Sequence, residues 1–179
     1  MRIDKLRQEF DLDIRWSVFP LHPNTPEAGM NLDELFAGQM DIEAMMSRLK
    51  RVANELELPF GDRMHTFNSR KAQELGKWAE EMGAGEAFHQ AVYHAYFAGG
   101  KNIAEKAVLT AIAESIGLDP EKALQVVADG RYAAAVNADW QRADELGVTA
   151  VPTLVYKSRQ LVGFQPYDAC RDFIDGGSV

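Results

Sequence analysis

The spacing of apolar residues predicts that most of the middle of the chain is helical. In residues 41–57, apolar side chains recur at i, i+3, i+4 and i+7, which places them on one face of a helix. Asp41 is suited to cap the start of this helix, and Pro59 is suited to end it. The same pattern predicts helices over residues 68–82 and 88–96, the first of them capped by Asn68. Further helices are predicted over residues 108–116, 119–129, 131–146 and 167–174.

Strand patterns occur only near the two ends of the chain. Residues 1–10 have helical spacing, and residues 14–19 then alternate between apolar and polar side chains, as in a strand. Residues 148–156 and 161–164 are β-branched and apolar on either side of a polar stretch, which predicts a hairpin with a connection of about four residues. One strand, about six helices, a hairpin and a last helix make an α/β pattern in which the helices form an insertion.

The charge pattern excludes some partners. The 179 residues carry a net charge of −8, with acidic and basic side chains interspersed, so we expect neither nucleic acid nor an anionic membrane as a partner. No apolar run is long enough for a membrane span, and the first residues do not resemble a signal peptide. We therefore expect a cytoplasmic protein.

The chemistry-bearing residues are few. Cys170 is the only cysteine, so the chain can form neither an internal disulfide nor a vicinal dithiol, and we expect an inert, buried thiol. His89 and His94 are five residues apart, which does not suit two zinc ligands on one helix face, so no metal site is expected. The helix start at residues 68–70 could bind an anion, although capping by Asn68 explains the same residues.

Two further features leave alternatives open. Tyr93, Tyr96 and Phe97 could line a groove beside two glycines, or could pack in the core. Pro152 lies inside an apparent strand, where proline removes a ladder hydrogen bond. A strand that begins at Thr153 would explain it, and so would a cis peptide bond, although base rates favour trans.

An ordered set of segments resembles the DsbA-like thioredoxin-fold family, and its FrnE-type branch in particular. The C-terminal part carries the strongest likeness, in LGVTAVPTLVY at residues 146–156 and LVGFQP at residues 161–166. The other matching segments, in family order, are WSVFPL at residues 16–21, FNSRKA at 67–72, FAGGKNI at 97–103 and IGLD at 116–119.

The resemblance implies a thioredoxin-like α/β fold with a large all-helical insertion. Residues 1–30 and 131–179 would form the thioredoxin-like part, and residues 31–130 the insertion. In the family a strand and a CxxC motif, or a serine variant, precede the segment that matches residues 1–10, so both should lie upstream of residue 1. The first strand of the sheet would then be missing from this chain, which predicts an altered sheet or a homodimer.

The resemblance also implies a site. It assigns cis geometry to Pro152 and gives Val151 backbone hydrogen bonds to a bound peptide or thiol. The leading interpretation is therefore a disulfide oxidoreductase by descent, with a thiol or peptide substrate but no redox dithiol of its own. One alternative is a glutathione-dependent enzyme similar to 2-hydroxychromene-2-carboxylate isomerase or the kappa-class transferases, with glutathione as its cofactor; another is a redox-inactive binding or structural module. No cofactor is expected under the leading interpretation, and no catalytic residue is assigned.

Overall fold

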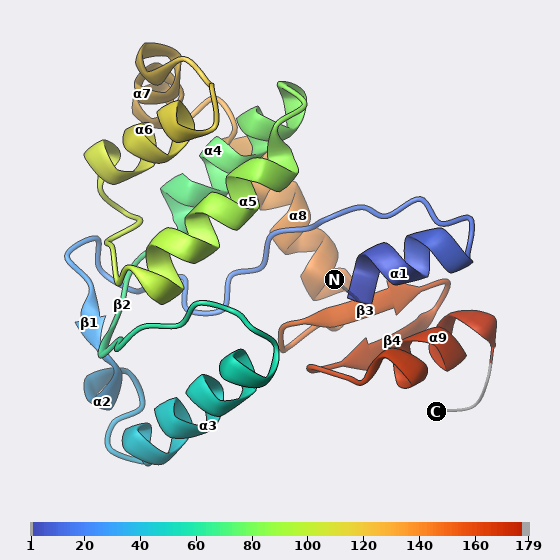
Figure 1. Ribbon diagram of the computed structural model, residues 1–179. Helices are drawn as coiled ribbons and strands as arrows, with labels where there is room; N and C mark the ends of the chain where they lie inside the picture. Colours follow the sequence, from blue (N-terminus) through green and yellow to red (C-terminus); the bar gives the residue numbers. More distant parts are fainter. Residues whose placement is uncertain (1, 177–179) are drawn as a thin grey trace. The chain divides into compact units, whose positions relative to one another are not determined.

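The computed structural model describes residues 2–176, and these residues form two compact units. One unit comprises residues 22–137, and the other combines the chain up to residue 21 with residues from 138 onward. The boundary at 137/138 falls within a helix. The elements follow one another as α1 (Arg2–Glu9), β1 (Met30–Asn31), α2 (Leu32–Leu35), α3 (Ile42–Glu55), β2 (His65–Thr66), α4 (Arg70–Glu81), α5 (Gly85–Tyr93), the π-helix η1 (His94–Ala98), α6 (Lys106–Ser115), α7 (Pro120–Asp129), α8 (Ala133–Glu145), β3 (Thr153–Tyr156), β4 (Arg159–Val162) and α9 (Tyr167–Asp175) (Figure 1).

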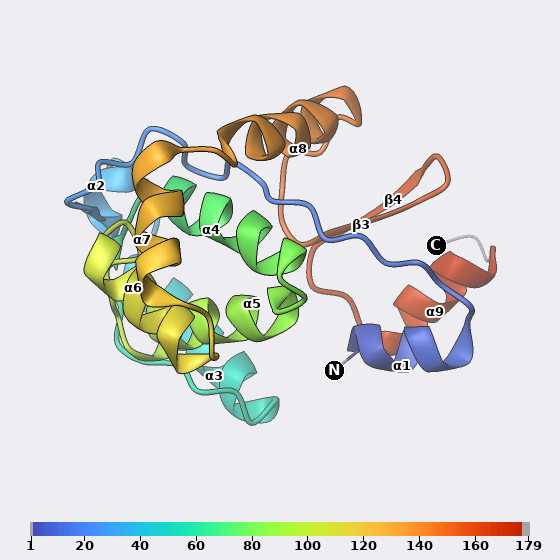
Figure 2. The ribbon, with the colours of Figure 1, turned by 90° about the horizontal axis from the view of Figure 1, so that it is seen from above.

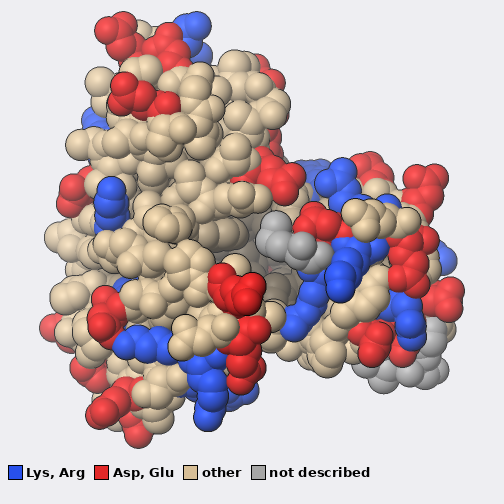
Figure 3. All heavy atoms as spheres, in the orientation of Figure 1, with Lys and Arg blue, Asp and Glu red and all other residues tan. Residues whose placement is uncertain are grey.

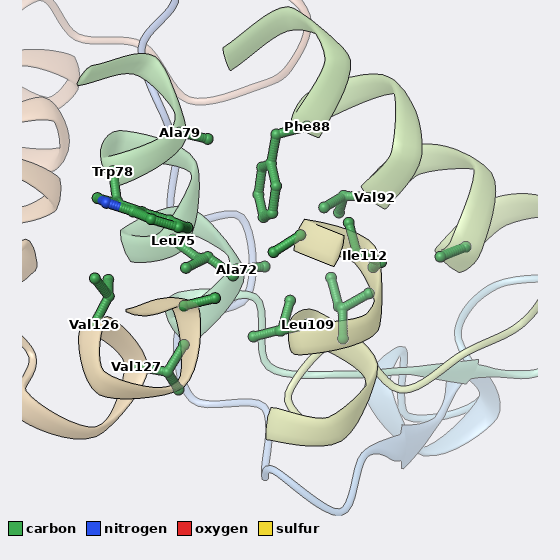
Figure 4. Packing of buried hydrophobic residues seen from close by; sticks show 14 residues of the cluster. Ala72, Leu75, Trp78, Ala79, Phe88, Val92, Leu109, Ile112, Val126 and Val127 are labelled. Carbon is green, nitrogen blue, oxygen red and sulfur yellow. The ribbon is translucent and has the colours of Figure 1, made fainter. Parts of the chain in front are cut away.

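The larger unit is built around helices α4 to α7. Their apolar faces meet in one cluster, in which Leu75 and Leu109 are fully buried and Phe88 is 1% exposed (Figure 4). The apolar spacing noted in the sequence therefore marks the faces that leave water, which is the main source of stability of these helices. The predicted cap at Asp119 is confirmed, because its side chain accepts from the backbone N–H groups of Glu121 and Lys122.

A second cluster in the same unit joins α2 and α3. Leu32, Ile42 and Met46 are buried together, and Asp41 caps α3 by accepting from the backbone N–H of Ala44 at 2.9 Å. Strands β1 and β2 pair antiparallel over two residues each. The expectation of an all-helical insertion is thus wrong in this detail, since two-residue strands are too short to produce an alternating pattern in the sequence.

The smaller unit consists of the β3–β4 hairpin, α1 and α9. Figure 2 shows α1 and α9 side by side along one face of the hairpin. Leu6, Leu161, Cys170 and Phe173 form the buried centre of this unit. The described residues therefore form a mostly helical α/β structure, as the sequence predicts, with one hairpin in this unit.

The strand predicted over residues 14–19 is not formed. This stretch carries no strand or helix assignment, although its alternating side chains suit a strand. A strand requires a neighbour to complete its backbone hydrogen bonds, and the sheet in this unit contains only β3 and β4 among the described residues. The altered sheet that the sequence predicts is therefore observed.

The hairpin connection is also shorter than predicted. Tyr156 pairs directly with Arg159, so only Lys157 and Ser158 connect the strands, rather than about four residues. Lys157 has φ +57°, which the tight two-residue hairpin turns require at their first central position. Lysine and serine are not the usual residues of such a turn, which explains why the sequence did not reveal it.

Candidate substrate-binding site

Val151 and Pro152 stand at the entrance to β3, and the peptide bond between them is cis. Both residues are exposed, and Val151 is 45% exposed. The backbone around them is held on both sides. The Gly163 N–H donates to the Pro152 carbonyl at 2.7 Å, and the Thr153 hydroxyl donates to the Ala150 carbonyl at 2.7 Å. The cis geometry that the resemblance implied for Pro152 is therefore observed.

One edge of β3 next to this bond is open. In an antiparallel hairpin with a two-residue turn, the closing pair, here Tyr156 and Arg159, is hydrogen-bonded, and such pairs alternate along the ladder. The bond from Gly163 to Pro152 fits this alternation. The backbone N–H and C=O groups of Thr153 and Val155 consequently point away from β4. No other strand pairs with β3 within residues 2–176.

Apolar side chains surround the open edge. Val155 is 39% exposed, Val162 is 49% exposed, and Phe164, which follows the residue paired with Pro152, is 56% exposed. The Arg2 guanidinium lies 3.8 Å from the centre of the Phe164 ring, where it can make a cation–π contact. A small unit that exposes this many large apolar side chains around an unpaired strand edge has the features of a binding surface.

Asp139 fixes the segment of residues 14–19, a role that the sequence did not reveal. Its carboxylate is 1% exposed, accepts from Arg15 Nη2 at 2.8 Å and accepts from the backbone N–H of Val18 at 3.0 Å. An aspartate inside a predicted helix is usually assigned to the solvated face. The one sequence signal is that Asp139 stands three residues after Val136, an apolar position on the same helix face.

Cys170 does not belong to the candidate site. Its side chain lies in the core of the smaller unit, and its Sγ lies 4.0 Å from the Gln165 carbonyl oxygen. Burial raises the pKa of the Cys170 thiol, and the positive charge of Arg2 offsets this effect only in part. A thiol with these properties is a poor nucleophile, in agreement with the inert role predicted for it.

The possible anion site at the start of α4 is occupied by internal contacts. Asn68 accepts from the Arg70 backbone N–H at 2.9 Å and donates to the Thr25 carbonyl at 2.7 Å. The Arg70 side chain donates to the buried carboxylate of Glu74 at 2.6 Å. Helix α4 itself begins at Arg70, after Ser69, so Asn68 stabilises the turn before the helix rather than its first residue.

The other candidate residues lie in the larger unit. Tyr96 and Phe97 pack edge to face with their ring centres 4.8 Å apart, and Tyr93 lies 6.1 Å from Phe97, so the structure does bring these three together. His89 lies near Glu80, with 3.7 Å between its Nε2 and a carboxylate oxygen. Among the described residues, His, Cys, Asp and Glu side chains do not gather in groups of three that could hold a metal ion.

The surface agrees with the charge pattern of the sequence. On the face shown in Figure 3, acidic and basic side chains are interspersed and separated by uncharged stretches. Over residues 2–176, no helix combines the length and the apolar character needed to cross a bilayer.

Comparisons with known proteins support the likeness noted in the sequence. The profile of the DSBA-like thioredoxin domain matches residues 1–175. The probable DsbA oxidoreductase of Streptomyces coelicolor is 26% identical, with a TM-score of 0.88 over 98% of this chain and 81% of that one. The 2-hydroxychromene-2-carboxylate isomerase is 17% identical, with a TM-score of 0.70 over 99% of this chain and 91% of that one, a likeness of fold alone. The comparison with curated proteins gave no match.

Proposed function

Because the chain belongs to the DsbA-like thioredoxin domain family, we propose that it binds an extended, cysteine-containing peptide at Val151 and Pro152, along the open edge of β3. The observation that supports this proposal is the exposed cis bond at Pro152, next to a strand edge whose backbone groups face away from β4. An added peptide strand would take its affinity from backbone hydrogen bonds to Thr153 and Val155, and apolar side chains around the edge would select its residues.

The proposed activity is binding rather than dithiol exchange. A thiol–disulfide exchange cycle within one chain needs a second thiol to resolve the mixed disulfide, and these 179 residues contain one buried cysteine. The bound peptide thiol is therefore held by this chain and is not oxidised by it. The same edge could pair with the edge of a second copy, which is how the proposed homodimer would form.

Backbone amide NMR tests this proposal directly. We expect a capped heptapeptide of alternating valine and threonine around a central cysteine to shift the amide signals of Val151 and Thr153 in a saturable manner. A peptide with serine in place of the cysteine shows what the thiol contributes. Glutathione, titrated in parallel, tests the isomerase-like alternative, and shifts caused by glutathione alone would overturn the proposal in favour of that alternative.

A matched pair of variants tests the role of the strand edge. Val155→Pro removes the N–H that faces away from β4 and leaves the hydrogen bonds within the hairpin untouched, since proline is tolerated at such edge positions. Val155→Thr keeps this N–H and the β-branched shape. We expect peptide binding to be lost in the first variant and retained in the second. Equal binding by both variants would show that the edge is not used. Sedimentation of the unliganded protein at several concentrations reveals whether two copies occupy the edge instead.

A further inference from the structure

A groove in the larger unit, distant in sequence from the peptide site, has the composition of a second binding surface. It has a volume of about 690 Å³ and is lined by the first turns of α3 and by residues from the loops that flank it. Its apolar lining consists of Met40, Ile42, Met46 and Met64. We name this surface the methionine groove.

The methionine groove has a fixed floor and an adaptable rim. Ile42 and Met46 are 4% and 7% exposed and belong to the packed cluster between α2 and α3. Met40 and Met64, in contrast, are 43% and 46% exposed. Methionine side chains are flexible and polarizable, and exposed methionines are typical of surfaces that adapt to apolar side chains of different shapes.

The charges around the methionine groove have one sign. Four carboxylates, those of Asp33, Asp41, Glu43 and Asp62, line it together with one cation, Lys50. Lys50 forms an ion pair with Asp62. Among the described residues, Asp33, Asp41 and Glu43 have no ion-pair partner of their own. A ligand for this groove therefore needs positive charge as well as an apolar part.

We propose that the methionine groove binds a basic amphipathic segment of another polypeptide, in which a large apolar side chain is flanked by lysine or arginine. The apolar side chain contacts Met40 and Met64 above the buried floor, and the basic side chains lie beside Asp33 and Glu43. The same carboxylates repel nucleic acids and anionic membranes, which leaves a cationic protein segment as the occupant that fits. This inference does not depend on the peptide site at Val151 and Pro152.

Methionine methyl NMR with a defined probe tests the location of binding. The probe is a fluorescein-labelled 12-residue helical peptide with leucines on one face and lysines on the other. We expect the methyl signals of Met40 and Met64 to shift in a saturable manner, and that of Met82, which is 48% exposed but lies at the end of α4, to stay unchanged. Shifts at Met82 alone, or no saturable shift, would overturn the proposal.

Charge variants test the contribution of the carboxylates. The double variant Asp33→Asn with Glu43→Gln should weaken binding of the probe about three- to tenfold at low salt, as measured by fluorescence anisotropy. The matched control, Glu55→Gln with Glu114→Gln, removes two exposed carboxylates of the same unit outside the groove and should change binding less than about twofold. Equal weakening by both double variants would show that only the net charge of the protein attracts the probe, and would refute the groove.

Discussion

Replacing Asp139 with alanine is expected to release the segment of residues 14–19. The buried carboxylate holds this segment through the Val18 N–H at 3.0 Å and the Arg15 guanidinium at 2.8 Å. A hydrogen bond to a charged acceptor contributes about 1.5–3 kcal/mol. The Arg15 side chain is 65% exposed, so its ion pair adds less than about 1 kcal/mol. We therefore expect Asp139→Ala to lower the free energy of unfolding of this unit by about 2–4 kcal/mol.

Native-state hydrogen exchange can measure this effect at the segment itself. The Val18 amide should lose its protection in Asp139→Ala, because its acceptor is gone. Arg15→Met, which keeps that acceptor, should leave the Val18 amide protected and cost less than about 1 kcal/mol. Asp139→Asn should be intermediate, since an amide oxygen can still accept one bond. If Arg15→Met costs as much as Asp139→Ala, the reasoning is wrong, and the surface ion pair rather than the backbone bond holds the segment.

Three further substitutions test local packing and titration. Gly76→Ala should stabilise the larger unit by about 0.5–1 kcal/mol in urea unfolding, because a Cβ in the middle of α4 meets only ordinary contacts. Gly61→Ala should destabilise it by about 1–3 kcal/mol, because a Cβ there would overlap the backbone carbonyl of Ala98; a neutral result would show that the loop can move aside. Burial lowers the pKa of His89 below its usual 6.5, and nearby Glu80 opposes this shift. The unfolded chain therefore takes up this proton first as the pH falls, so between about pH 7.5 and about pH 5.5 the wild type should lose more stability than His89→Asn.

The features that the sequence predicted are those set by local periodicity. The apolar spacing in residues 41–57 and the cap at Asp41 depend only on neighbours within a few positions, and α3 forms as expected. The hairpin is likewise visible in its β-branched residues. The cis bond at Pro152, in contrast, followed from the family resemblance and not from residue physics, which favours trans.

The features that the sequence missed depend on distant partners. Residues 14–19 have strand-like alternation, but a strand forms only where another strand can pair with it. Asp139 is buried because two donors from residues 15–18 reach it, over 120 positions away in the chain. The methionine groove combines a helix start with two loops, so no single stretch of sequence reveals it.

The short length of the open edge of β3 has a consequence for how long a partner stays bound. Pro152 has no N–H to donate, and the backbone turns away at Lys157, so only the outward groups of Thr153 and Val155 can engage an added strand. Four backbone hydrogen bonds at about 0.5–1.5 kcal/mol each support weak, rapidly reversible association. The same limit protects the protein from polymerising edge to edge, because a ladder that ends after four residues gives a growing fibre too little to hold. Brief residence and resistance to fibre growth thus follow from the same proline.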